Sequence, residues 1–67
     1  DAAPVARRRI LLDGAWHEVA VFDFAALAPG QRVAGPAIVE SDTTTVLLRH
    51  GDAARMDAAR LLDIAIG

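Results

Sequence analysis

Few side chains in this sequence have reactive chemistry, and the most suggestive of them lie together in mid-chain. Glu40 and Asp42 are two residues apart, so their carboxylates would share one face of a continuous strand. Such a pair could act as general acid and base or bind a divalent cation. In the structural interpretation, Asp42 accepts backbone N–H bonds at a corner, and Thr43, Thr44 and Thr45 supply β propensity. We favour the structural interpretation.

The other reactive groups are isolated in the sequence. Ser41 is the only serine and lies in no Gly-x-Ser-x-Gly context, so it does not resemble a nucleophile elbow. There is no cysteine, and all seven cationic side chains are arginine, which removes lysine-based nucleophiles and cofactor linkages. His17 and His50 are far apart and lack the spacing of a metal site. We therefore assign no catalytic, cofactor-binding or metal-binding residue in this chain.

The length of the chain limits how stable it is alone. Its 67 residues make one small module, for which we expect a flexible start over residues 1–6. A chain of this size buries only roughly 60% of the surface that its unfolded form exposes. Without cysteines it has no disulfides, so a partner is the remaining source of stability.

Charge and hydropathy exclude two classes of partner. A net charge of −2, a pI near 5.4 and 4% aromatic residues argue against nucleic-acid binding, which needs a basic face and stacking platforms. No apolar run approaches the roughly 18 residues of a membrane helix. We expect a soluble chain that interacts with neither nucleic acid nor membrane.

The strongest local pattern is a β-hairpin formed by residues 7–12 and 15–22 around an Asp13-Gly14 turn. This turn sets a register in which Leu11 faces Trp16 and Arg9 faces Glu18. Both faces are then apolar near the turn, and a module this small can cover only one of them. Leu11 and Trp16 are therefore candidates for contact with another chain, unless Trp16 folds over its own core.

The remaining segments also read mainly as strands. Asp23 caps one helical turn that ends at Pro29-Gly30, and a run of three arginines protects an edge strand from pairing. Residues 52–62 are also compatible with a helix, but we favour a final hairpin. The expected strands and turns cover residues 31–34, 37–40, 44–49, 50–52, 53–57 and 61–66. The prediction is an all-β fold, a small open barrel or bent antiparallel sheet of four to six short strands with one helical turn.

Three segments, LLDGAWHEVAVFD, ALAPGQRVAGPAIVE and SDTTTVL, occur in this order at residues 11–23, 26–40 and 41–47. Together they resemble the C-terminal end of hydantoinase A/5-oxoprolinase large subunits, a family that includes subunits of acetone and acetophenone carboxylases. The resemblance runs from about Arg9 to Ile66. The chain departs from the family pattern at Ala58-Ala59-Arg60, where relatives have a glycine-asparagine type of turn.

The resemblance implies a cytoplasmic, multi-subunit enzyme that uses ATP and a divalent metal. In that family an actin-like ATPase chain activates a lactam or carbonyl by phosphorylation, and a hydantoinase B-like subunit completes hydrolysis or carboxylation. The nucleotide-binding segments lie upstream of this region, so no catalytic residue is carried over. The resemblance implies a docking role on the larger hydantoinase A-like ATPase chain or the second subunit. The expected contacts are Leu11, Trp16, Glu40, Asp42, Thr43, Thr44 and Thr45.

Two other classes compete with this interpretation. Lipoyl and biotinyl carriers are small β modules, but they need a lysine at a hairpin tip, which this chain lacks. A free-standing protein-binding adaptor without a catalytic partner is the alternative that stays open. The sequence leaves equally open whether the chain is a separate gene product, a cleaved piece or a fragment of a longer subunit.

Overall fold

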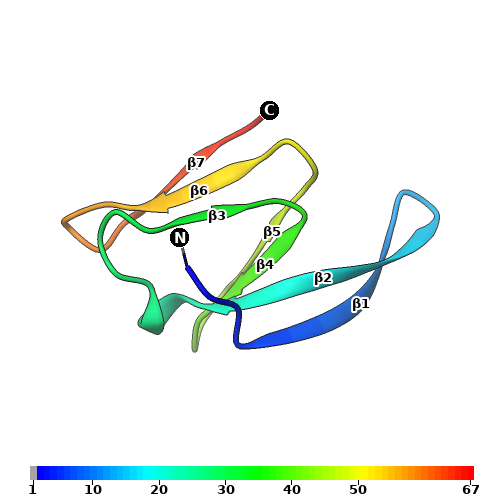
Figure 1. The fold of residues 1–67 in the computed structure, drawn as a ribbon, viewed down its shortest axis with the longest axis horizontal. Coiled ribbons are helices and arrows are strands. Elements are labelled where there is room, and N and C mark those ends of the chain that lie inside the picture. The colour runs from blue at the N-terminus through cyan, green and yellow to red at the C-terminus, as the bar shows by residue number, and fades with distance from the viewer. Residues whose placement is uncertain (1) are drawn as a thin grey trace.

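Seven strands and one 3-10 turn make up the computed structural model, which describes residues 2–67. The elements are β1 (Ala6–Leu12), β2 (Ala15–Asp23), the 3-10 helix η1 (Phe24–Ala26), β3 (Arg32–Ala34), β4 (Ala37–Glu40), β5 (Thr45–Leu48), β6 (Ala53–Met56) and β7 (Leu62–Ala65). They form two open sheets, with strand orders β1-β2-β4-β5 and β3-β6-β7 (Figure 1). The predicted all-β class with a single helical turn is confirmed. In the described part of the chain no helix has the length and apolar character needed to cross a membrane.

The first hairpin has the predicted register. Leu11 pairs with Trp16 and Arg9 with Glu18, and the pairing continues to Ala6 opposite Val21. Asp13 and Gly14 have φ of 51° and 80°, the positive values that a two-residue hairpin turn needs at both central positions. Figure 1 shows the turn end of this hairpin projecting beyond the other strands.

The pairing of β2 with β4 differs from the expected antiparallel arrangement, because these two strands run parallel. Parallel neighbours need a crossover of roughly a dozen residues or more, and residues 24–36 supply it through η1 and β3. Seven strands form rather than the expected four to six, because even the three-residue strand β3 finds a partner in β6. The crossover therefore links the two sheets.

The main core lies on one face of the four-stranded sheet and joins it to the three-stranded sheet. Its buried members are Phe22, Leu27, Val33, Ala37, Val39, Leu48, Ala54 and Met56. A smaller cluster of Val19, Val21 and Ile38, with Ile10 packed against it, lies on the opposite face of the four-stranded sheet. Both faces of β2 are therefore buried near its C-terminal end, whereas its turn end is exposed.

The last segment is a hairpin, as we favoured, and not the alternative helix. β6 pairs antiparallel with β7, and the Asp57 carboxylate accepts hydrogen bonds from the backbone N–H groups of Ala59 and Leu61, both at 2.9 Å. Arg60 occupies the left-handed position of this turn with φ of 66°. The turn thus forms with Ala58, Ala59 and Arg60 in place of the glycine-asparagine type of turn that the resemblance implied, because the Asp57 side chain stabilises it locally.

The N-terminal segment contacts both sheets. The Ala2 N–H donates to the Arg32 carbonyl at 3.5 Å, and the Val5 N–H donates to the Val21 carbonyl at 2.8 Å. Asp1 lies outside the described residues. The flexibility of residues 1–6 and the assignment of residues 1–67 to one module stay predictions.

Candidate functional site

The most exposed large apolar side chains on the four-stranded sheet lie at the turn end of the first hairpin. Leu11 is 58% exposed and Trp16 is 63% exposed, and the two are paired across β1 and β2. Trp16 therefore does not fold over the core of its own module. By strand alternation, Arg7, Arg9 and Glu18 share this surface, which we call the arm face. The role of Leu11 and Trp16 as partner contacts stays a prediction.

Arg9 faces Glu18 as predicted, but it stacks on the indole of Trp16. Its guanidinium carbon lies 5.6 Å from the centroid of the Trp16 ring, a cation–π distance. Within residues 2–67 the ion pairs are Arg8 with Glu40 and Arg49 with Asp13, so Arg9 and Glu18 form none. The arm face thus combines an exposed indole with a guanidinium placed over it.

The corner between β4 and β5 is stabilised by Ser41 and not, as we expected, by Asp42. The Ser41 hydroxyl oxygen accepts from the N–H groups of Thr43 at 3.4 Å and Thr44 at 3.2 Å. The backbone N–H of Ser41 donates to the Thr44 carbonyl at 2.8 Å. Within the described residues the Asp42 side chain accepts no hydrogen bond. Serine can form the same local turn as aspartate, so the sequence pattern alone did not distinguish them.

Glu40 belongs to an ion pair and not to a carboxylate pair with Asp42. Its Oε2 atom lies 2.7 Å from Nη1 of Arg8, whereas β4 ends at Glu40 and leaves Asp42 beyond the strand. The hydrogen bond from Arg8, and more weakly its charge, lower the pKa of Glu40 below its usual range. Residues 2–67 contain no group of three or more histidine, cysteine or acidic side chains able to hold a metal ion. Glu40 and Asp42 nevertheless line one surface depression of about 320 Å³ together with Asp23, so the structure keeps the two predicted carboxylates near each other while Arg8 pairs with one of them.

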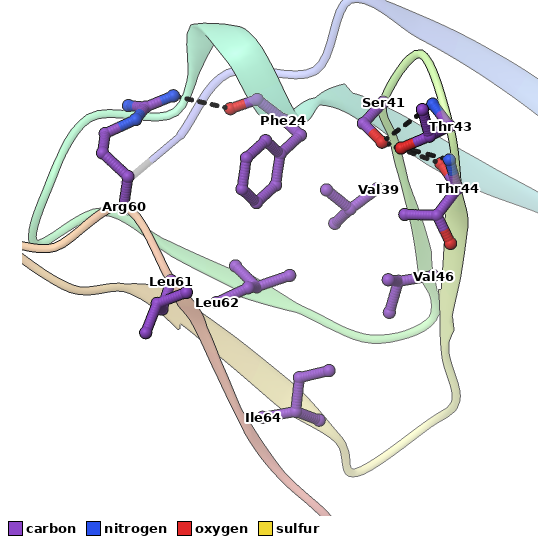
Figure 2. Close-up of a pocket in the computed structure, with 10 residues that line it drawn as sticks. All are labelled: Phe24, Val39, Ser41, Thr43, Thr44, Val46, Arg60, Leu61, Leu62 and Ile64. Carbon is purple, nitrogen blue, oxygen red and sulfur yellow. Dashed lines mark hydrogen bonds between the residues drawn. The ribbon is translucent and has the colours of Figure 1, made fainter.

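A cleft of about 400 Å³ opens between the corner and the last hairpin (Figure 2). Apolar side chains from η1, β4, β5 and β7 line it, with hydroxyl groups of the corner at one end and a guanidinium at the other. The lining residues are Phe24, Val39, Ser41, Thr43, Thr44, Val46, Arg60, Leu61, Leu62 and Ile64. Two of the predicted corner residues, Thr43 and Thr44, thus lie at the cleft, while Thr45 is exposed on β5.

Sequence reasoning missed the apolar part of this cleft. Leu62 and Ile64 alternate along β7 with the period of a strand, which was the available signal. Their side chains reach the cleft because β7 is the edge of the three-stranded sheet. The position of Phe24 follows from η1, which Asp23 begins by accepting from the Ala25 N–H at 3.1 Å.

Arg60 joins the last hairpin to η1 across the mouth of the cleft. Its guanidinium donates to the Leu27 carbonyl and, at 3.4 Å each, to the carbonyls of Phe24 and Ala25. The same guanidinium lies 5.8 Å from the Phe24 ring centroid. Nothing in the sequence pairs Arg60 with η1, which is more than 30 residues away. Arg60 therefore connects the turn of the last hairpin to η1 beside the cleft.

The two histidines are closer in space than their sequence positions indicate. His17 and His50 are both exposed and line one depression of about 200 Å³, together with Asp13 and Arg49. The Arg49 guanidinium lies 3.4 Å from Oδ1 of Asp13. This depression lies at the turn end of the first hairpin, and Leu12 and Pro36 add apolar surface to it.

The chain matches the hydantoinase/oxoprolinase C-terminal domain family over residues 1–65, and it belongs to this family. The family resemblance inferred from the sequence is thereby confirmed.

Two relatives make the comparison specific. The chain is 31% identical over 64 residues to the acetone carboxylase beta subunit of Xanthobacter autotrophicus (strain ATCC BAA-1158 / Py2), covering 96% of this chain and 9% of that protein. It is also similar to a chain in the nucleotide-free structure of acetone carboxylase, which was solved to explain ATP-dependent acetone carboxylation. The TM-score of this match is 0.87, and the sequence identity is 31%. That match covers 97% of this chain and 9% of the other. The chain therefore spans about a tenth of the length of these relatives.

Proposed function

We propose that this chain is a docking module of a multi-subunit, ATP-dependent enzyme of the hydantoinase, oxoprolinase or ketone carboxylase type. Its role is structural: it holds the larger hydantoinase A-like ATPase chain, or the hydantoinase B-like subunit, in place. ATP, a divalent metal and the reactive residues belong to the rest of that assembly, which we place in the cytoplasm.

The arm face is the observation that carries this proposal. Leu11 and Trp16 are more than half exposed at the turn end of the first hairpin, although Val19, Val21 and Phe22 farther along β2 are buried. Aromatic residues and arginine are enriched where protein interfaces gain most of their binding energy. Several of the described titratable side chains meanwhile have structural contacts: Asp23, Asp52 and Asp57 stabilise turns, and Arg8, Glu40, Arg49 and Asp13 form ion pairs. Membership of the family, with relatives that are far longer, supports a module whose chemistry lies outside it.

The test is purification from the native source with an affinity tag on the chain. We expect a hydantoinase A-like ATPase chain, in the same polypeptide or as a tightly bound subunit, together with a hydantoinase B-like subunit. ATP hydrolysis by the purified material should depend on one of three added substrates: a hydantoin, 5-oxoproline or a ketone with bicarbonate. Recovery of the chain without any ATPase partner would contradict the proposal and favour the adaptor.

A further inference from the structure

Arg9 is a cation that is held in place but has no acidic partner in residues 2–67. Its guanidinium carbon lies 5.6 Å from the centroid of the Trp16 ring, and no hydrogen bond or ion pair engages its donors within this part of the chain. The other arginine side chains with recorded partners are Arg8, which contacts Glu40, Arg49, which contacts Asp13, and Arg60, which contacts three carbonyls. A stacked guanidinium keeps its planar fork of donors free, and that fork matches a carboxylate.

The charge of the arm face is opposite to that of the whole chain. Two arginines and one glutamate, Arg7, Arg9 and Glu18, give it a net charge of +1 (+2 − 1), whereas the chain carries −2. Leu11 and Trp16 add exposed apolar surface beside these charges. A partner that fits this surface therefore carries carboxylates beside a bulky apolar side chain.

Nucleic acid fits the same surface less well than a protein does. Glu18 would lie against its phosphates, and the exposed Leu11 side chain would gain nothing from them. Affinity for nucleic acid comes mainly from several basic side chains that neutralise phosphates, and this face has only two.

We propose that the arm face binds an acidic protein segment, with a carboxylate on Arg9 and an apolar side chain packed against Leu11 and Trp16. The inference rests on the proposed function, because it places this segment in the larger ATPase chain or the second subunit. Beyond the proposed function, the inference specifies that the partner segment is acidic and that Arg9 is the residue that recognises it.

The identity of the segment is tested by cross-linking in the assembled enzyme purified as described above. Trp16 is replaced by the photoreactive residue p-benzoylphenylalanine in the complete gene, and the cross-linked peptide is sequenced. We expect a peptide from the ATPase chain or the second subunit that has Asp or Glu next to a bulky apolar residue. A peptide without acidic residues, or a cross-link to nucleic acid, would overturn the inference.

The role of Arg9 is tested by charge reversal with a matched control. Arg9→Glu should weaken retention of the partner by about tenfold or more, as expected for an interfacial arginine. Arg9→Lys should be intermediate, because lysine lacks the bidentate fork. Arg55→Glu, which reverses an exposed charge on β6, should leave retention unchanged. Raising NaCl from about 50 to about 200 mM should weaken the wild type more than Arg9→Glu, because salt screens exposed charges.

The outcomes separate the inference from the proposed function. If the wild type retains no ATPase chain or second subunit, the proposed function fails. If the wild type retains one and Arg9→Glu and Arg9→Gln retain it equally well, only the inference fails. Arg9→Gln is included because it removes the charge without introducing a repulsive one, and both variants are checked for an unchanged circular dichroism spectrum.

Discussion

Arg8 and Glu40 lie 32 residues apart in the sequence, and their side chains meet at 2.7 Å across strand β2. They belong to β1 and β4, which flank β2 and are not paired with each other in the sheet. Val19 and Val21, each 1% exposed, are buried on the face that this ion pair crosses. The pair therefore joins β1 to β4 beside a cluster whose described members, Val19, Val21, Ile38 and Ile10, all come from the four-stranded sheet.

The pH dependence of this contact follows from the lowered pKa of Glu40. A carboxyl whose pKa is lower in the folded state adds stability that is present above its unfolded pKa, near 4.5, and is lost as the pH falls through the folded value. We expect an NMR titration to give Glu40 a pKa below its usual range and Arg8→Gln to restore it. Arg49→Gln, which removes the other ion pair, should leave the Glu40 titration unchanged. The accompanying change in stability is small because both partners are exposed.

Arg60 should contribute measurably to the stability of the last hairpin. Arg60→Ala removes the hydrogen bonds to three carbonyls and should lower the free energy of unfolding by about 1–2 kcal/mol. Arg60→Gly loses the same bonds but removes the strain of a side chain at a left-handed backbone position. This variant should therefore be more stable than Arg60→Ala by about 1 kcal/mol. The measurement is urea unfolding in trimethylamine N-oxide, which strengthens the burial of a marginal module. Equal stability of wild type and Arg60→Ala would show that Arg60 does not hold η1.

Truncation of two neighbouring leucines of β5 should change the stability by very different amounts. Leu48 is 1% exposed and belongs to the main core, so Leu48→Ala should cost about 2–5 kcal/mol of unfolding free energy. Leu47 points to the other face and is 41% exposed, so Leu47→Ala should change stability by less than about 0.5 kcal/mol. The same urea titration compares them. Similar losses for both would place β5 in a different register.

Gly35 is required by a close approach of two backbones. A Cβ atom added there would lie 1.9 Å from the Arg49 carbonyl oxygen, and the atoms it meets are backbone that cannot rotate away. Gly35→Ala should therefore cost about 3 kcal/mol or more. At Gly30 an added Cβ meets nothing within 4 Å, so Gly30→Ala should cost only the strain of its φ of 90°, about 1–2 kcal/mol. Circular dichroism melts of both variants provide the comparison.

Local patterns were sufficient to predict the hairpins but not the way they pack. The Asp13-Gly14 turn defined the first register, because a two-residue turn permits one pairing only. The parallel contact of β2 and β4 depends on a crossover through the second sheet, for which the sequence has no local signal. The alternation of apolar and polar residues shows that a segment is a strand but not which strand it pairs with. The position of β3 could therefore be predicted from the sequence, but its pairing with β6 could not.

The candidate surfaces were predicted to different extents. Exposure of Leu11 and Trp16 was expected because a small module should cover one face only, but both faces of β2 are buried farther along the strand. The two side chains are exposed because the turn end of their hairpin projects beyond the other strands (Figure 1). The cleft was missed because Phe24, Val46 and Ile64 come from three separate segments that meet only after the sheets pack. The contacts of Arg8 and Arg60 span more than 30 residues, and the sequence offered several equivalent arginines for each.

Hydrogen exchange of the first hairpin in the assembled enzyme tests the docking account most directly. Amide exchange over residues 9–18 is compared between the assembled enzyme and the enzyme carrying Trp16→Asp, with residues 53–56 of β6 as the internal reference. Docking of the arm face predicts slower exchange of residues 9–18 in the wild-type assembly, by about tenfold or more, and loss of that protection in Trp16→Asp. Equal exchange of these residues in the two assemblies would contradict it.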